Sequence, residues 1–321
     1  KINIFICIYI NMKIDFNNLK ERFLNTKTIS ELTVKNYVCQ LKKFKNIDLN
    51  NIYLIKEISQ KFKPASFKNS ISAIIKYIRL DENHDEDLVD KYLDYSDELT
   101  EQDIRNPNIK TEKEELKWTT MDKLKEVLND YHLKIIKNNI FETSYENLNK
   151  SDKKILNNYI ILSLYLLQPP RRVQDYSNMI IIDNERPPRN DNYNYLIIKN
   201  GSVYQFEFNK YKTAKTYGQQ RINISNELKI ILNKYMKIIF NYQPIHLLSN
   251  NKPFSPNILT KRIIEIFKTS RIKKAISVNI IRHIYISDKV GADQIEIMKK
   301  REILAYNMGH STKTQINYIK Y

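Results

Sequence analysis

The chain is poor in the residues that mark several protein classes. Its two cysteines, Cys7 and Cys39, cannot form a disulfide framework, and neither lies in a Cys/His cluster with zinc-ligand spacing. No apolar run reaches the roughly 20 residues of a membrane-spanning helix. The apolar stretch from Ile2 to Ile10 is too short for a span, and it lacks the small-residue cleavage site of a secretory signal. We therefore expect an intracellular protein in a reducing compartment, with no metal or other cofactor.

Positive charge, in contrast, is abundant. Among 321 residues, 53 Lys and Arg against 36 Asp and Glu give a formal net charge of +17. Such an excess calls for a polyanionic partner, of which nucleic acid is the commonest. The wealth of Lys, Asn, Ile and Tyr is also what an AT-rich genome encodes through codon bias. Charge alone therefore leaves nucleic-acid binding and codon bias open.

The first third of the chain predicts a small helical domain with basic outer faces. Between Thr33 and Phe44, apolar residues recur at the spacing of an amphipathic helix. A second such pattern, from Phe67 to Ile78, follows Pro64, a residue suited to the first turn of a helix. Two or more short helices are expected to pack into a bundle.

The end of this bundle is marked by a change in charge. The run from Asp81 to Asp103 is acidic, which predicts a solvated face or hinge pointing away from any phosphate. The segment from Arg105 to Lys117 contains Asn106-Pro107 and is expected to be the linker. We place the boundary near residue 115. The expected organisation is an N-terminal extension (1–26), in which Met12 is the expected natural start, a helical domain (27–115) and a second domain (116–321).

The second domain is expected to be mainly α with a small antiparallel β-sheet, an α+β class. Thr120 offers an N-cap for a helix beginning at Met121, and the stretch from Ile155 to Gln168 is apolar nearly all round, which predicts a buried central helix. Asn200-Gly201 is the dipeptide that a tight hairpin prefers. Four segments have β character: Met179–Ile182, Tyr195–Ile198, Val203–Phe208 and Arg221–Ile224.

The residues with the most informative chemistry lie in the last forty positions. Arg282 and His283 are adjacent, His310 follows Gly309, and Tyr318 lies eight residues beyond His310. A guanidinium binds phosphate oxygens with a planar fork, a histidine adds a hydrogen bond, and a phenol can be ionised to attack as a nucleophile. Each residue alone has a commoner structural explanation, so the prediction depends on their order.

In that order the residues resemble the catalytic set of the tyrosine recombinases, the phage-integrase-like enzymes that cut and rejoin DNA. The family's first arginine follows a central helix and precedes an acidic residue by three positions, as Arg172 precedes Asp175. The family's lysine lies on a β-hairpin, where this chain has Lys212. The resemblance covers most of the chain, from about Lys27, and the N-terminal half resembles the family's SAM-like core-binding domain.

This resemblance implies a mechanism, a partner and an assembly. Arg172, Arg282 and His310 would stabilise the charge that develops on a phosphodiester. Lys212 would protonate the leaving 5′ oxygen, and Tyr318 would form a 3′-phosphotyrosine without metal or ATP. The implied partner is double-stranded DNA, on which the chain would form a homo-oligomer, a tetramer in this family.

The chain departs from the family pattern near Arg282 and near its end. Asn279 stands three residues before Arg282, where the family has histidine or lysine, so His283 or a water would have to compensate. Only three residues follow Tyr318, where the family usually continues with a helix that docks on a neighbouring subunit. A copy with reduced activity is one consistent interpretation.

Three site positions also have alternates. Two prolines replace the family's Thr-Gly turn before the first arginine, and the tyrosine lies one residue closer to the histidine than usual. The alternates are Arg171 for Arg172, Lys215 for Lys212, and Tyr321 for Tyr318.

The pattern leaves three functions open. A site-specific recombinase or integrase is favoured, and the AT-rich composition with Pro-Pro-Arg-Arg resembles integrases of large DNA viruses, virophages and related mobile elements. A type IB topoisomerase would use a related constellation to relax supercoils. A protein that keeps the fold without the chemistry, which Asn279 favours, would bind duplex DNA without a covalent adduct. Each would act where its DNA is, in a prokaryotic cytoplasm or in a eukaryotic nucleus or viral factory.

Overall fold

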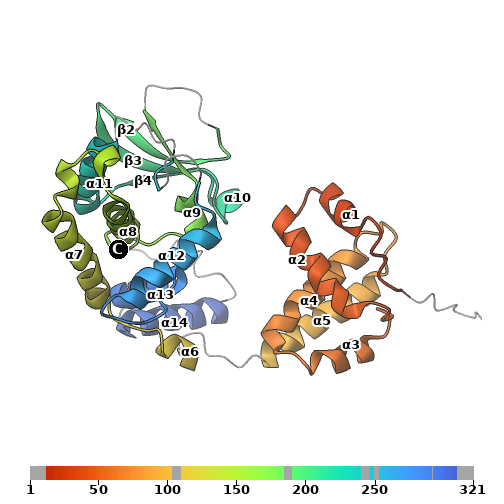
Figure 1. The fold of residues 1–321 in the computed structure, drawn as a ribbon. Coiled ribbons are helices and arrows are strands. Elements are labelled where there is room, and N and C mark those ends of the chain that lie inside the picture. The colour runs from red at the N-terminus through yellow and green to blue at the C-terminus, as the bar shows by residue number, and fades with distance from the viewer. Residues whose placement is uncertain are drawn as a thin grey trace, which may run out of the picture. The chain divides into compact units, whose positions relative to one another are not determined.

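The chain divides into two compact units, residues 1–109 and 110–321. A computed structural model describes residues 12–102, 110–183, 190–239, 246–248, 253–290 and 292–308. Figure 1 shows an all-helical N-terminal unit and a C-terminal unit that also holds a sheet. Among the helices within these ranges, none has both the length and the apolar character of a membrane span.

The N-terminal unit is a helical bundle, as the apolar spacing predicted. Ser30 caps α2 by accepting a hydrogen bond from the backbone N–H of Thr33, and Pro64 occupies the first turn of α4. The helix α4 contacts both α2 and α5, and its buried face includes Phe67 and Ile74. The helices are α1 (Leu19–Asn25), α2 (Glu31–Leu41), α3 (Ile52–Ser59), α4 (Pro64–Ile78) and α5 (Glu86–Gln102), with a 3-10 turn η1 (Lys42–Phe44) after α2.

Most of the acidic run forms the outer face of α5. Tyr92, Tyr95 and Leu99 of this helix are buried, and the Tyr92 hydroxyl donates a hydrogen bond of 2.7 Å to the carbonyl of Leu49. The carboxylates between these positions are exposed, and Glu98 pairs with Lys56 at 2.7 Å. The acidic run was predicted to be a solvated face or a hinge, and in α5 it forms a solvated face.

The C-terminal unit is built around the predicted central helix, α8. The Asn149 side chain caps it by accepting from the backbone N–H of Asp152, and its residues from Tyr159 to Leu166 are all buried. The helices α7, α11 and α12 all contact α8. The helices are α6 (Glu112–Glu115), α7 (Met121–Lys137), α8 (Lys150–Leu166), α9 (Val173–Ser177), α10 (Ala214–Tyr217), α11 (Asn226–Ile239), α12 (Pro256–Thr269), α13 (Val278–Lys289) and α14 (Ala292–Asn307), with 3-10 turns η2 (Ile140–Glu142) and η3 (Tyr145–Asn147).

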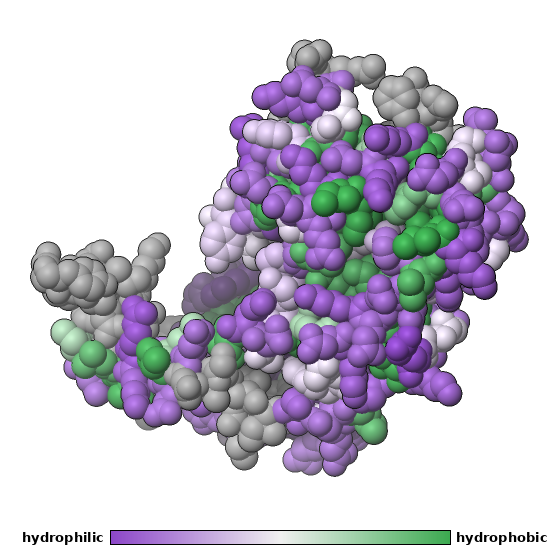
Figure 2. Space-filling view, turned by 90° about the vertical axis from the view of Figure 1, so that its left-hand side faces the viewer, coloured by the Kyte–Doolittle hydropathy of each residue, from purple (hydrophilic) through white to green (hydrophobic). Residues whose placement is uncertain are grey.

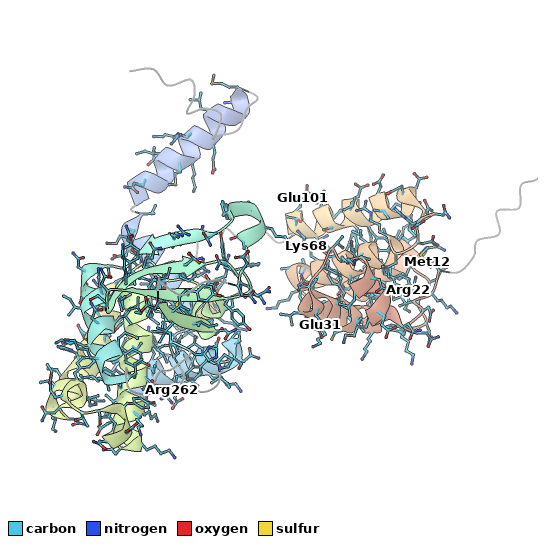
Figure 3. All side chains as sticks on the ribbon, turned by 90° about the horizontal axis from the view of Figure 1, so that it is seen from above. Met12, Arg22, Glu31, Lys68, Glu101 and Arg262 are labelled. Atoms are coloured by element: carbon cyan, nitrogen blue, oxygen red, sulfur yellow. The ribbon has the colours of Figure 1, made fainter. Side chains whose placement is uncertain are left out.

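A polar chain joins three of these helices. Nε of Arg262, labelled in Figure 3, donates to Oδ1 of Asn158 at 2.7 Å, and Nδ2 of Asn158 donates to the Tyr131 hydroxyl at 3.0 Å. These contacts link α12, α8 and α7.

On the face seen in Figure 2, hydrophilic residues dominate and hydrophobic ones lie in smaller groups, which is normal for a protein surface.

The sheet has four strands in the order β1-β2-β3-β4, and it is mixed, so the prediction of an antiparallel sheet was partly wrong. The α+β class itself is confirmed. Strands β2 and β3 form the predicted hairpin, with Asn200 and Gly201 at φ values of 51° and 71°, as a tight turn of this kind requires. The strands are β1 (Met179–Asp183), β2 (Asn194–Lys199), β3 (Ser202–Phe208) and β4 (Gln220–Asn223).

The error concerns only the direction of the first strand. β1 runs parallel to β2, with Met179 beside Asn194 in the register. Strands joined by a tight turn are antiparallel, whereas a parallel pair needs a longer connection that brings the chain back to the start of the first strand. Apolar residues identify a strand but carry no information about its direction.

Candidate active site

A cavity of about 610 Å³ opens in the C-terminal unit where α8 ends and α9 begins. Strand β4, the β3–β4 connection and helix α13 supply the other walls. Most of the polar lining comes from side chains that are far apart in the sequence. They are Gln168, Arg171, Arg172 and Asp175 around the α8–α9 turn, Tyr211, Thr213 and Tyr217 in the β3–β4 connection, Gln220, Asn223 and Ser225 in and after β4, and Arg282 and Tyr285 on α13.

Arg172 reaches the cavity from the N-cap of α9. Pro169 and Pro170 follow the end of α8, and Arg172 is extended, with φ −69° and ψ 155°. Its carbonyl accepts the backbone N–H of Asp175 at 3.0 Å, which begins the helix. Within the described part of the chain, the half-buried side chain of Arg172 makes no hydrogen bond or ion pair. Its guanidinium is therefore available to an anion in the cavity.

Arg171 also lines the cavity, but its guanidinium is bound to the protein. Nε donates to Oδ2 of Asp175 at 2.9 Å, and Nη1 donates to Oε1 of Gln220 on β4, also at 2.9 Å. The Cζ atom lies 3.8 Å from the ring centroid of Phe208 and 5.1 Å from that of Tyr211. Arg171 thus joins the α8–α9 turn to the β3–β4 hairpin.

Asp175 lies in the floor of the cavity. It is 2% exposed, and burial raises the pKa of its carboxyl above the ordinary value, while the neighbouring Arg171 acts in the opposite direction. Its Oδ1 and the Oε1 of Gln168 are buried without a hydrogen-bond partner among the residues described. Both oxygens are buried, so they are not presented to a ligand in the cavity.

Lys212 lies in the turn between β3 and α10. Its side chain is exposed and is not part of the cavity lining, whereas its neighbours Tyr211 and Thr213 both line the cavity. The Tyr211 hydroxyl donates a 2.7 Å hydrogen bond to the carbonyl of Gly218, which closes this turn. The alternate Lys215 lies on α10 and is also exposed.

Helix α13 brings Arg282, which lies far from Arg171 and Arg172 in the sequence, to the same cavity. Ile281 and Ile284 are on its buried side, and Arg282 is half-buried at the edge of that side. Asn279 and His283 lie three residues before and one after Arg282, on the exposed face, and neither lines the cavity. The structure therefore brings Arg282 to Arg171 and Arg172, but it leaves Asn279 and His283 outside.

Three of the predicted site residues lie outside the described part of the chain, in the segment 309–321. They are His310, Tyr318 and Tyr321. Tyr217 and Gln220, which were not predicted as site residues, also line the cavity. Their position between Lys212 and the predicted strand Arg221–Ile224 could have identified them as site residues, because side chains in one hairpin connection reach the same edge of a sheet.

The sequence matches no protein-family model and no curated protein. Among solved structures, the chain is similar to a crystal structure of XerA recombinase, with a TM-score of 0.32 and 15% sequence identity. That match covers 85% of this chain and 83% of the other. A function for the cavity therefore has to follow from the residues that line it.

Proposed function

We propose that the chain cleaves and rejoins duplex DNA as a tyrosine-type site-specific recombinase, through a 3′-phosphotyrosine intermediate. The observation that carries the proposal is that Arg172 and Arg282, distant in the sequence, line one cavity, and that both neighbours of Lys212 line it too. The proposal includes a homo-oligomer on the DNA and action where that DNA is found.

The two arginines suit a phosphodiester in the transition state. As a nucleophile adds, negative charge grows on the non-bridging oxygens, and fixed cationic donors bind this state more strongly than the ground state. Arg171 is bound to Oδ2 of Asp175, whereas Arg172 makes no hydrogen bond or ion pair with this carboxylate among the described residues. Two permanently charged forks are thereby left to hold one phosphate.

The remaining roles are a general acid and a nucleophile. We assign the acid to Lys212, because it is an exposed lysine between Tyr211 and Thr213, two residues that line the cavity. The nucleophile is assigned from the sequence to Tyr318, with Tyr321 as the alternate. A second candidate function is binding of duplex DNA without cleavage, favoured by the amide of Asn279 beside Arg282.

The test is the trapping of a covalent adduct. Duplexes that bind the full-length chain are first selected from a random-sequence library. A nick beside each possible scissile phosphate then lets the cleaved end diffuse away, so that the adduct accumulates. We expect an adduct that survives denaturing electrophoresis, is lost in Tyr318→Phe and is retained in Tyr321→Phe.

Each other outcome has a clear meaning. Loss in Tyr321→Phe with retention in Tyr318→Phe would move the nucleophile to Tyr321. Tight binding with no adduct at any nick position would reject the enzyme and leave the DNA-binding protein. Adducts at many unrelated sequences, with relaxation of supercoiled plasmid and no exchange between two sites, would identify a topoisomerase.

A further inference from the structure

Asn194, at the start of β2, has a side-chain amide whose hydrogen-bonding groups are all engaged. The residue is 4% exposed. Its Nδ2 donates to the carbonyls of Asp175 at 2.9 Å and Lys210 at 3.0 Å, and its Oδ1 accepts from the backbone N–H groups of Asn209 at 2.9 Å and Lys210 at 2.8 Å. An amide side chain has two donor hydrogens and two acceptor lone pairs, and all four are engaged here.

These bonds join two segments that carry proposed site residues. Asp175 belongs to α9, which begins directly after Arg172. Asn209 and Lys210 begin the turn that holds Lys212. The pairing of β2 with its neighbouring strands uses backbone groups, so the sheet itself does not need this side chain.

The far end of the same turn is fixed as well. The Tyr211 hydroxyl binds the carbonyl of Gly218, and Nη1 of Arg171 binds Gln220 at the start of β4. The backbone at Lys212 is therefore held between two tethered ends, and only its exposed side chain is left to move. Such a tether sets the distance from the ammonium to a phosphate held by Arg172.

We infer that Asn194 is a positioning residue, which holds the Lys212 turn against α9 so that the ammonium meets the leaving oxygen of the phosphate bound by Arg172. This inference rests on the proposed function. It predicts a defect confined to one step, protonation of the leaving group. Loss of the side chain leaves four backbone groups of the two segments without their partner and frees the turn.

Leaving-group chemistry separates this role from a general structural one. An alkoxide oxygen needs a proton to leave, whereas a sulfur in the same bridging position leaves as a thiolate, because a thiol has a pKa of roughly 8.5. A misplaced general acid therefore slows cleavage of the oxygen substrate and spares a 5′-phosphorothiolate. A distorted cavity slows both.

The experiment measures single-turnover adduct formation by the full-length chain on matched duplexes with oxygen or sulfur at the bridging position. Asn194→Ala is expected to be slowed about 100-fold on oxygen, the cost of a small displacement of a catalytic group, and to equal the wild type on sulfur. Lys212→Ala is expected to share this pattern. The matched control is Asn233→Ala, because Oδ1 of Asn233 accepts the backbone N–H of Val203 at 2.7 Å, at the other end of β3. It should behave alike on both substrates.

Failure of the inference and failure of the proposed function give different results. Equal slowing of Asn194→Ala on oxygen and sulfur, with a wild-type adduct present, overturns the positioning role and leaves the function standing. No wild-type adduct on either duplex overturns the function and the inference together. Should Asn194→Ala fail to fold, Asn194→Asp, which keeps an acceptor for Asn209 and Lys210, is held to the same criterion.

Discussion

Arg171 donates a hydrogen bond of 2.9 Å from its Nε to Oδ2 of Asp175, one helical turn further along the chain. The carboxylate is nearly inaccessible to solvent and the arginine side chain is largely buried. The adjacent Arg172 has no such partner within the described ranges. Two neighbouring arginines therefore have different roles, one bound to the protein and one free to bind a ligand.

This difference predicts opposite effects on stability and activity. Arg171→Ala is expected to lower the free energy of unfolding by about 3 kcal/mol, because it leaves the carboxylate of Asp175 buried without its partner. Arg172→Ala is expected to change it by less than about 0.5 kcal/mol and to abolish adduct formation. Urea unfolding followed by the fluorescence of Trp118, the single tryptophan, reports on the C-terminal unit. A neutral Arg171→Ala and an unfolded Arg172→Ala would reverse the assignment.

The raised pKa of Asp175 predicts a pH dependence of stability with a definite sign. A carboxyl whose pKa is raised in the folded state stabilises the fold while protonated, and this contribution is lost as pH rises through the folded pKa. Asp175→Asn removes the titration. As pH falls from about 7, the unfolding free energy of the wild type should therefore rise relative to that of Asp175→Asn. A difference that moves the other way on acidification would show that Arg171 outweighs burial.

The helices and strands of this chain were largely predictable because their signals are local. The spacing of apolar residues in α4 and α8, the N-cap at Thr120 and the Asn200-Gly201 turn each act within a few residues. The direction of β1 was not predictable, because it depends on the path of the connection to β2.

The cavity was predictable only in part, for a related reason. Residue types indicated a phosphate site, but the choice between Arg171 and Arg172 depends on Gln220 and Phe208, which tertiary folding brings to Arg171 alone. Asn194 had no sequence signal, because the backbone groups that it binds lie 15 to 19 residues away.

The salt dependence of DNA binding should show how many phosphates Arg172 and Arg282 contact. The logarithm of the DNA-binding constant falls linearly with the logarithm of salt concentration, by about 0.9 for each phosphate contacted. Arg172→Ala and Arg282→Ala should both reduce that slope, by about 1 when they are combined, because the two guanidiniums are proposed to contact one phosphate. Arg271 is the matched control, since it is exposed but paired with Asp130 and Glu126, and Arg271→Ala should leave the slope unchanged. Equal slopes for all three variants would place the DNA elsewhere.

Asn279 offers a gain-of-function test of the site. It lies on the exposed face of α13, one turn before Arg282, and its amide cannot accept a proton at neutral pH. Asn279 does not line the cavity, but it lies one helical turn from Arg282, so a histidine there, with an ordinary pKa of about 6.5, can act as a base for a phenol that attacks from this side of α13. We expect Asn279→His to form the adduct about tenfold faster than the wild type, with a new rise in rate between about pH 6 and pH 7.

The controls separate this effect from a change in DNA binding. Asn279→Ala removes the amide without adding a base, so it should match the wild-type rate and pH profile. His283→Ala tests whether the neighbouring exposed histidine already supplies the base. If it does, His283→Ala should form the adduct about tenfold more slowly than the wild type. Adduct formation by Asn279→His that is no faster than by Asn279→Ala, at equal DNA affinity, would mean that proton acceptance from this face of α13 does not limit cleavage.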